Sequence, residues 1–220
     1  MCNLYRLHAG PAAIAQLFDA VVGAIGNQGA EVYPGYPGLV VADGAVSAMN
    51  WGFPVVLKGR DGRALRPKPV TNARDDKLHT PFWRASFAAR RCLIPVSHWA
   101  EPEGPPRAMT RTWYGLPGEA VIAIAGLWRD TPEWGRVYAM VMVDASPAMR
   151  DVHDRMPVIL GREDRARWIG DDPAAAQACV QTWPGDLSVI RTQDRWAGGT
   201  TRQHDLFADS GIRPEAPRAG

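Results

Sequence analysis

The sequence predicts a single α+β domain around a largely antiparallel, barrel-like β-sheet with a few peripheral helices. The chain has 220 residues, which suits one domain with its own core. Short β-prone segments fill its middle and do not alternate regularly with helices, which argues against a parallel α/β fold. Hydrophobic residues make up 46% and charged residues 22%, so the composition excludes a mostly disordered or fibrous chain.

Near the N-terminus the sequence predicts one amphipathic helix followed by a β-hairpin. Pro11 fits a first helical turn, and apolar residues at helical spacing continue to about Gly26: Ile14, Leu17, Phe18, Val21, Val22 and Ile25. Asp43-Gly44 lies between two β-prone segments, and this dipeptide favours a tight hairpin turn because both residues accept a positive φ.

The remaining elements are short. Strands are expected over 92–99, 112–114, 120–128, 137–143, 157–160 and 187–190. Helices are expected after Ser146-Pro147 and over 163–169 and 173–180, where Ser or Asp caps and prolines stand near the starts. Residues 197–220 carry too little apolar surface to offset their ordering entropy, so we expect a mobile tail after a domain covering 1–196.

Several classes of protein are excluded. No apolar run approaches the length of a membrane span, and the start lacks the apolar region of a signal peptide, so we expect a soluble, cytoplasmic protein. The cysteines Cys2, Cys92 and Cys179 are odd in number, far apart and without a Cys-x-x-Cys pair. This spacing indicates neither a disulfide framework nor a cysteine zinc site, and we expect no metal and no cofactor.

The formal net charge of +2 conceals a basic middle segment. Residues 58–111 hold twelve Lys or Arg against five Asp or Glu, and 22 of the 25 basic residues of the chain are Arg. The planar fork of Arg suits bidentate contact with phosphate oxygens. The segment therefore favours a nucleic-acid partner, although GC-rich coding and a solvated basic face remain alternative explanations.

Cys2 directly follows the initiator methionine, so an aminopeptidase that removes Met1 would make it the terminal residue. A terminal cysteine places an α-amine of pKa about 7.7–8.0 beside a thiol of pKa about 8.5, so both groups are partly nucleophilic at neutral pH. Such a 1,2-aminothiol attacks an aldehyde, and the thiol then closes onto the imine carbon to give a thiazolidine. A cysteine at position two is by itself more often incidental.

Several segments contain residues that could act together with Cys2, and their order along the chain is informative. They are MCNLYR at the start, WGF at 51–53, TNAR at 71–74, PFWRASFAARRCLIP at 81–95, Glu101, AGLW at 125–128 and HDRMPVIL at 153–160. Together these segments closely resemble the SOS response-associated peptidase family, whose members are also called abasic-site processing proteins. The resemblance runs from Cys2 to about Trp168.

The resemblance implies a protein of the DNA damage response that senses abasic sites in single-stranded DNA and shields them. It captures the ring-opened sugar as a thiazolidine crosslink on its N-terminal cysteine, with peptidase, hydrolase or lyase as its enzyme class. By position, Cys2 matches the family's nucleophile, Asn72 its substrate-orienting amide, Glu101 its catalytic carboxylate, His153 its acid–base histidine and Arg74 its phosphate-binding arginine. The chemistry agrees, because ring opening needs a proton relay and dehydration of the carbinolamine needs an acid.

The expected DNA surface combines a positive groove with aromatic faces on which bases stack. Its candidates are Trp51, Arg84, Arg90, Arg91 and Arg155. Trp51 fits the core equally well, and one of the paired arginines must point away if both lie on a strand. Arg84 and Arg155 rank first because they fall inside family-like motifs.

The sequence also departs from the family. Asn3 replaces a glycine, residues 33–35 replace a DNA-contacting loop, and Pro102 replaces the aromatic residue after the acid. Two other functions stay open: an N-terminal-nucleophile amidase or self-processing peptidase, and a non-covalent single-strand binder in which Cys2 is incidental. In each case we expect a monomer that has no membrane partner.

Overall fold

A closed β-barrel forms the centre of the molecule. The computed structural model describes residues 2–196 of the chain. Five strands close the barrel: β4 (Pro37–Ala42), β5 (Ala45–Trp51), β9 (Arg91–Val96), β12 (Ile122–Thr131) and β13 (Gly135–Asp144). Neighbours pair antiparallel in the order β13-β12-β9-β4-β5, and β5 returns to pair with β13 in parallel. The predicted α+β fold with a barrel-like, largely antiparallel sheet is confirmed.

The predicted hairpin at Asp43-Gly44 is confirmed as β4–β5. Ala42 pairs with Ala45, so only these two residues form the loop. Asp43 has φ 51° and Gly44 φ 72°, the two positive values that a tight turn of this kind requires. This turn fixes the register of the first two barrel strands.

Short strands extend the barrel sheet at the end where β13 finishes. β8 (Asn72–Arg74) pairs in parallel with Met140–Met142, and β14 (Arg155–Pro157) pairs antiparallel with Met142–Asp144. β15 (Ile159–Leu160) pairs with β12. Separately, β2 (Val21–Val22) pairs with the first residues of β5. Segments far apart in sequence, around residues 72 and 155, therefore meet along β13.

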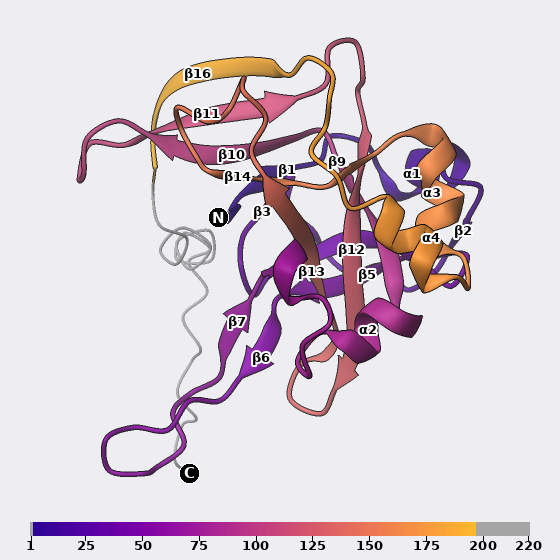
Figure 1. The fold of residues 1–220 in the computed structure, drawn as a ribbon, viewed down its shortest axis with the longest axis vertical. Coiled ribbons are helices and arrows are strands. Elements are labelled where there is room, and N and C mark those ends of the chain that lie inside the picture. The colour runs from indigo at the N-terminus through magenta and orange to yellow at the C-terminus, as the bar shows by residue number, and fades with distance from the viewer. Residues whose placement is uncertain (1, 197–220) are drawn as a thin grey trace, which may run out of the picture.

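A second sheet lies across the barrel, with β10, β11 and β16 along the top of Figure 1. Its order is β16-β11-β10-β1-β3. The bounds are Tyr5–Arg6 for β1, Glu31–Val32 for β3, His98–Glu103 for β10, Thr110–Gly115 for β11 and Ser188–Arg195 for β16. β6 (Phe53–Val55) and β7 (Lys68–Val70) form a separate hairpin that extends away from the barrel (Figure 1).

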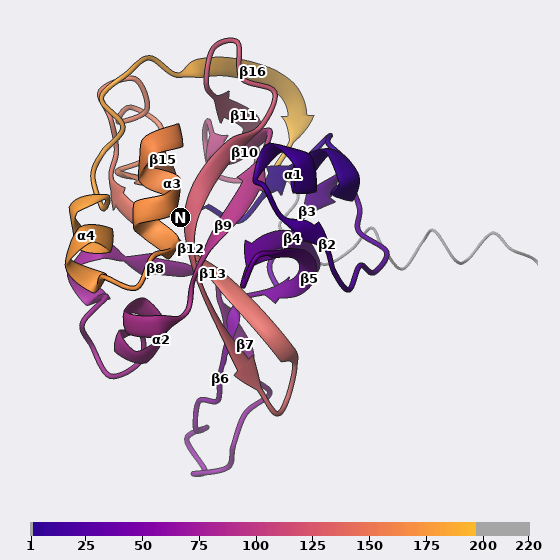
Figure 2. The ribbon, with the colours of Figure 1, turned by 90° about the vertical axis from the view of Figure 1, so that its right-hand side faces the viewer.

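The helices are short and peripheral. They are α1 (Pro11–Leu17), the 3-10 turn η1 (Asp75–Lys77), α2 (Arg84–Ala89), α3 (Arg162–Ile169) and α4 (Pro173–Ala178). Figure 2 shows α1 beside β4 and β5, with α3 and α4 farther to the left in that view, and Arg165 of α3 lies 4.8 Å from the ring centre of Phe18, directly after α1. The helices predicted over 163–169 and 173–180 are confirmed. Within residues 2–196 no helix is long and apolar enough to cross a membrane.

Three predicted elements differ from the structure. The first helix ends at Leu17 instead of near Gly26, because Asp19 adopts a positive φ of 50° and Val21–Val22 pair with β5 as a strand. The segment after Ser146-Pro147 forms turns and no helix. The strand expected over 92–99 is interrupted at Ser97, where β9 of the barrel ends and β10 of the second sheet then begins. The predicted tail, 197–220, lies outside the described residues.

A buried tyrosine pair joins the two sheets. The hydroxyls of Tyr5 in β1 and Tyr138 in β13 lie 2.5 Å apart, and the rings of both contact the indole of Trp51. A Cβ on Gly38 in β4 would collide with both hydroxyls, so a glycine is required there. These contacts fix β1, and with it the start of the chain, against the barrel.

Candidate active site

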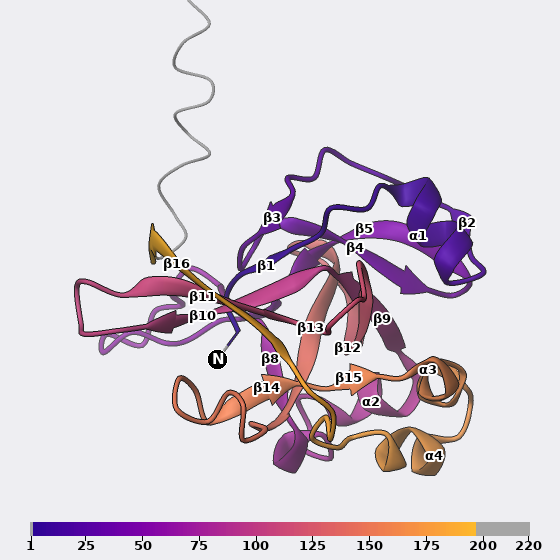
Figure 3. The same cartoon turned by 90° about the horizontal axis from the view of Figure 1, so that it is seen from above.

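The site is assembled where the start of the chain meets β8. Cys2 is fully buried, and the side-chain amide of Asn72 donates a hydrogen bond of 2.9 Å to its backbone carbonyl. The amide N–H of Ala100 in β10 donates to the carbonyl of Leu4, which extends the β1–β10 pairing toward Cys2. Figure 3 shows β1 beginning close to β10 and β11, with β8 and β14 nearby. The fold thus brings together two of the residues predicted to act on the substrate.

Asn72 retains an acceptor that its neighbours do not use. Its Nδ2 also donates to Oγ1 of Thr71 at 2.8 Å, so both of its protons are engaged. Within residues 2–196 its Oδ1 is buried and receives no hydrogen bond. A buried amide oxygen of this kind is suited to accept a proton from a bound amine or hydroxyl.

Glu101 lies on β10 with no exposed surface. Burial raises its pKa to about 7, and the negative charge of Asp154 also acts to raise it. A carboxyl group with this pKa is partly protonated at neutral pH, so it can donate a proton or accept one. This is the behaviour expected of the acid predicted at position 101.

The Cys2 thiol is not a ready nucleophile in this setting. Burial raises its pKa well above the ordinary value, and the negative charge of Glu101 raises it further. Its Sγ lies 3.6 Å from the carbonyl of Leu4, to which the S–H donates. These surroundings disfavour the thiolate while residue 1 is attached; the expected partial ionisation of the thiol concerns Cys2 as the free terminal residue and stays a prediction.

His153 precedes β14, and its ring is held by the backbone beside it. Nδ1 lies 2.9 Å from the backbone nitrogen of Arg155 and 3.1 Å from the carbonyl oxygen of the same residue, so it accepts from the N–H in one neutral tautomer and donates to the carbonyl in the other. Burial lowers the pKa of His153, while the carboxylate of Asp154, 3.2 Å from Nδ1, acts to raise it. After protonation, Nδ1 faces this carboxylate and the carbonyl of Arg155 at 3.1 Å as acceptors. Both protonation states of the ring thus have partners.

The predicted phosphate-binding arginines meet near Asn72 but already hold carboxylates. Arg74, two residues after Asn72 on β8, bonds both carboxylate oxygens of Asp76, with 3.1 Å from Nε to Oδ1. Arg155 bonds Asp75 at 2.7 Å from Nη1 to Oδ1. Arg84 stands apart from this pair, exposed at the start of α2.

Two other DNA candidates belong to the core. Trp51 has no exposed surface, and its indole N–H donates to the carbonyl of Thr71 at 3.1 Å, so it does not present a face to a base. Arg91 is buried on β9 and donates to backbone carbonyls at the ends of α2 and α3, including that of Trp168 at 2.6 Å. Its neighbour Arg90 is half-buried.

Sequence reasoning missed Thr71, Asp75, Asp76 and Asp154. Each lies directly beside, or one residue from, a predicted site residue, so the signal was adjacency within the TNAR and HDR segments. It could not be used, because adjacency along a chain does not show which side chains face one another. Among residues 2–196 no group of three or more His, Cys, Asp or Glu side chains is placed to hold a metal ion.

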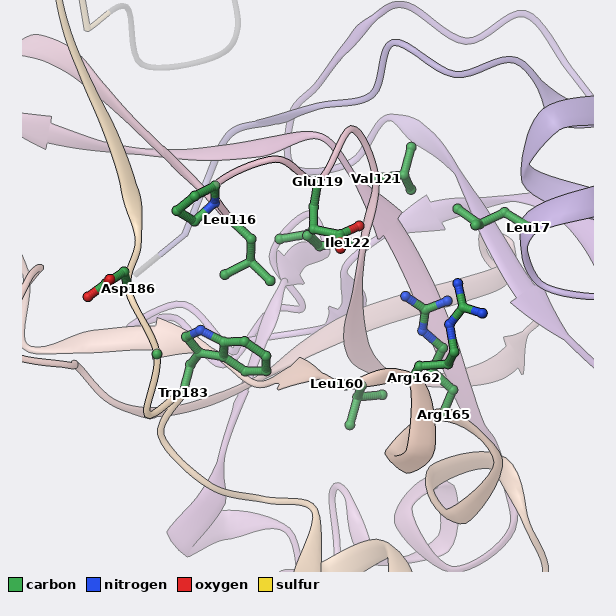
Figure 4. A pocket seen from close by; sticks show the side chains of 13 residues that line it. Leu17, Leu116, Glu119, Val121, Ile122, Leu160, Arg162, Arg165, Trp183 and Asp186 are labelled. Carbon is green, nitrogen blue, oxygen red and sulfur yellow. The ribbon is translucent and has the colours of Figure 1, made fainter.

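A separate cavity of about 440 Å³ lies between α1, α3 and the segment before β16 (Figure 4). Its lining combines apolar side chains, including Leu116 and Trp183, with the cations Arg162 and Arg165. None of the predicted site residues lines it. The carboxylates Glu119 and Asp186 also line it, so the cavity carries no net charge.

A family model described as SOS response associated peptidase (SRAP) matches residues 1–195. The chain belongs to the SRAP family. SRAP relatives include two abasic site processing proteins of Bacillus subtilis strain 168, YoqW at 32% identity and YobE at 30%, each over 126 residues. The matches cover 53% of this chain and 56% and 58% of those relatives, so this chain spans little more than half of their length.

Solved structures show the same SRAP fold. A protein from Bordetella bronchiseptica matches with a TM-score of 0.72 at 23% identity, covering 87% of this chain and 99% of that one. A protein from Bacteroides thetaiotaomicron matches with a TM-score of 0.71 at 19% identity, covering 86% and 92%. The recognition of the family from its motifs is confirmed.

Proposed function

We propose that this SRAP protein captures abasic sites in single-stranded DNA as a thiazolidine on Cys2, shielding the lesion in the cytosol. The observation that carries the proposal is the buried juxtaposition of Cys2 with Asn72, together with a Glu101 whose pKa of about 7 lets it exchange protons. Relatives at about 30% identity are named abasic site processing proteins, which supports the same substrate. The proposal requires that residue 1 is removed, because the Cys2 nitrogen is otherwise an amide in a peptide bond and cannot form an imine. Because Cys2 is buried, it also requires that the terminus opens to DNA.

The reaction conserves all atoms apart from one released water. The ring-opened sugar presents an aldehyde, and the α-amine of Cys2 adds to it to give a carbinolamine. A proton from the Glu101 carboxyl leaves with the hydroxyl as water, and a protonated imine forms, which keeps its N–H. The Cys2 sulfur then adds to the imine carbon, the C=N electron pair returns to the nitrogen, and the thiol proton passes to the Glu101 carboxylate. Because Glu101, ionised by the preceding step, accepts this proton during the addition, the high pKa of the thiol is tolerated.

His153 is proposed to serve the preceding step, the opening of the sugar hemiacetal. In the neutral tautomer with its proton on Nδ1, which then donates to the carbonyl of Arg155, Nε2 takes the hydroxyl proton while the bond to the ring oxygen breaks, and the proton passes on to that oxygen. Asn72 is proposed to hold the amine or the sugar hydroxyl through Oδ1 while its Nδ2 fixes Cys2. The contribution of Asn72 is orientation rather than proton transfer.

Intact mass measurement tests the proposal directly. Wild-type protein lacking Met1 should gain the mass of an abasic oligonucleotide minus water, and should gain nothing from an undamaged oligonucleotide. Cys2→Ala retains an α-amine, so it should give no stable adduct alone but a reduced adduct in the presence of borohydride. A wild-type protein without Met1 that forms no adduct would overturn the proposal. An equal, borohydride-independent adduct in Cys2→Ala would show that no thiazolidine is involved.

The amidase or self-processing alternative places different demands on Cys2. It requires a thiolate to attack an acyl carbon, whereas burial here raises the pKa of the thiol. The imine route asks only for a neutral amine and a thiol that transfers its proton during addition. The surroundings of Cys2 therefore favour crosslinking over acyl transfer.

A further inference from the structure

One short turn supplies the carboxylates that occupy both arginines next to the site. Asp75 and Asp76 open the 3-10 turn that follows β8. Asp75 pairs with Arg155, whose side chain is only 17% exposed, and Asp76 pairs with Arg74, whose side chain is 47% exposed. These two arginines come from strands on β13 that are about eighty residues apart in sequence, and adjacent residues of a single turn neutralise them.

The pairs form one network with no net charge. Lys77 lies 3.3 Å from Asp76, and Asp144 lies 3.4 Å from Nε of Arg155. The pKa of Asp76 is lowered: desolvation is the largest single contribution and acts to raise it, but the hydrogen bond of Lys77 and the charges of Arg74, Lys77 and Arg155 together outweigh it. Three cations thus face three carboxylates, so this surface attracts phosphate less strongly than its arginines alone would suggest.

The network adjoins the candidate active site through two backbone connections. Arg74 projects from the same face of β8 as Asn72, because alternate residues of a strand share a face. Arg155 is bonded through its N–H to the ring of His153. A strand of DNA whose sugar reaches Cys2 must therefore pass these arginines with its flanking phosphates, if the proposed function holds.

We propose that Asp75 and Asp76 act as tethered counterions that hold Arg74 and Arg155 in place and set the affinity and salt dependence of single-strand binding. Each arginine that takes a DNA phosphate must exchange a carboxylate of its own chain for it. Ordinary cationic contacts release salt ions from the DNA, which drives binding at low salt. Here separating the two internal ion pairs offsets part of the free energy gained from salt-ion release, so single-stranded DNA binds more weakly. Discrimination of abasic DNA from undamaged DNA then depends more on the sugar captured at Cys2.

The test is the affinity of Asp75→Asn/Asp76→Asn for undamaged oligothymidylate, measured by fluorescence anisotropy across a salt series. Each unmasked arginine should steepen the slope of log K against log salt by about 0.7, hence by about 1.4 for both. At low salt the double variant should bind roughly tenfold more tightly, because the two ion pairs that it removes are each of moderate strength. The single variants should each show about half of the change in slope.

A matched control removes the same charge elsewhere. Asp43 and Asp130 both pair with Arg136, at 3.5 and 3.4 Å, at the opposite end of β13. Asp43→Asn/Asp130→Asn should leave the slope within experimental error of wild type. An equal effect in this control, or weaker binding by the site variant with an unchanged melting temperature, would overturn the inference. Because the probe has no abasic site, the result is separate from crosslinking: a wild type that binds but never crosslinks refutes only the proposed function.

Discussion

The amide of Asn72 holds the backbone carbonyl of Cys2 at 2.9 Å, joining residues seventy positions apart at the start of the chain and on β8. The contact lies beside the buried hydroxyl pair of Tyr5 and Tyr138, which ties β1 to the barrel. The position of the candidate nucleophile is therefore set by the barrel and not by the N-terminal segment itself. The position of Cys2 can therefore be tested by substitutions at other residues.

Asn72→Ala should slow crosslinking about tenfold while leaving binding to undamaged single strands nearly unchanged. The lost hydrogen bond contributes about 1–1.5 kcal/mol, and 1.4 kcal/mol corresponds to a factor of ten in rate. Single-turnover kinetics with an abasic oligonucleotide give the rate, and anisotropy gives the affinity. Asn50→Ala is the control, since its amide also donates to a carbonyl, that of Trp134 at 3.0 Å. Equal losses in both variants would point to general destabilisation.

Glu101→Gln should stabilise the fold at pH 8 by up to about 3 kcal/mol, because it removes a carboxylate that burial disfavours. The folded pKa of about 7 lies above the ordinary value of 4.5, so the folded state binds more protons than the unfolded state between these values. Wild-type stability should therefore fall as pH rises from about 4.5 to 7. Urea titrations at pH 5 and pH 8 measure the difference. The exposed Glu133→Gln should retain the wild-type pH dependence, whereas a slope that persists in Glu101→Gln would refute the assignment.

The crosslinking rate should be bell-shaped in pH. It should fall above about pH 7 as the Glu101 acid ionises, and fall below about pH 7.7–8.0 as the α-amine of Cys2 becomes protonated. Burial lowers the pKa of His153, so protonation of its ring should steepen the acidic limb only below its ordinary value of about 6.5. Glu101→Gln should abolish the alkaline limb, and His153→Ala should remove the added steepness below about pH 6.5. A wild-type profile that is flat between pH 5 and 9 would exclude both roles.

Tyr5→Phe and Tyr138→Phe should each destabilise the fold by about 1–3 kcal/mol, because each leaves one buried hydroxyl without its partner. The double variant should cost less than the sum of the two, since neither unpaired hydroxyl remains. Thermal unfolding of the wild type, the two single variants and the double variant measures the free energies of this double-mutant cycle. Additive losses would mean that the two hydroxyls do not interact in solution.

The local sequence pattern was sufficient to predict secondary structure wherever residues close together in the chain decide it. The Asp43-Gly44 turn follows from two residues that accept a positive φ, and α4 follows from the Asp172 side chain that caps its start and the proline in its first turn. The first helix was predicted too long, because Val21 and Val22 fit a helical spacing and a strand equally well. Pairing with β5, a partner more than twenty residues away, decided in favour of the strand.

The candidate active site, too, could be predicted from the sequence only in part. Sequence motifs identified Cys2, Asn72, Glu101 and His153, and the structure places Cys2 against Asn72. The state of these groups was beyond the sequence: with residue 1 attached, burial raises the pKa of the Cys2 thiol, and burial shifts the pKa of the Glu101 carboxyl to about 7. Trp51 and Arg91 could not be assigned to core or surface, since either side chain suits both.

The sequence by itself determined the family, the barrel-like fold class and the chemical identity of the candidate groups, because these follow from residue types in a fixed order. Only the tertiary structure decided which side chains face one another, how far water is excluded from Cys2 and Glu101, and that Asp75 and Asp76 neutralise the nearby arginines. The physical reason is that desolvation and charge pairing depend on distances between segments, and strand pairing along β13 sets those distances.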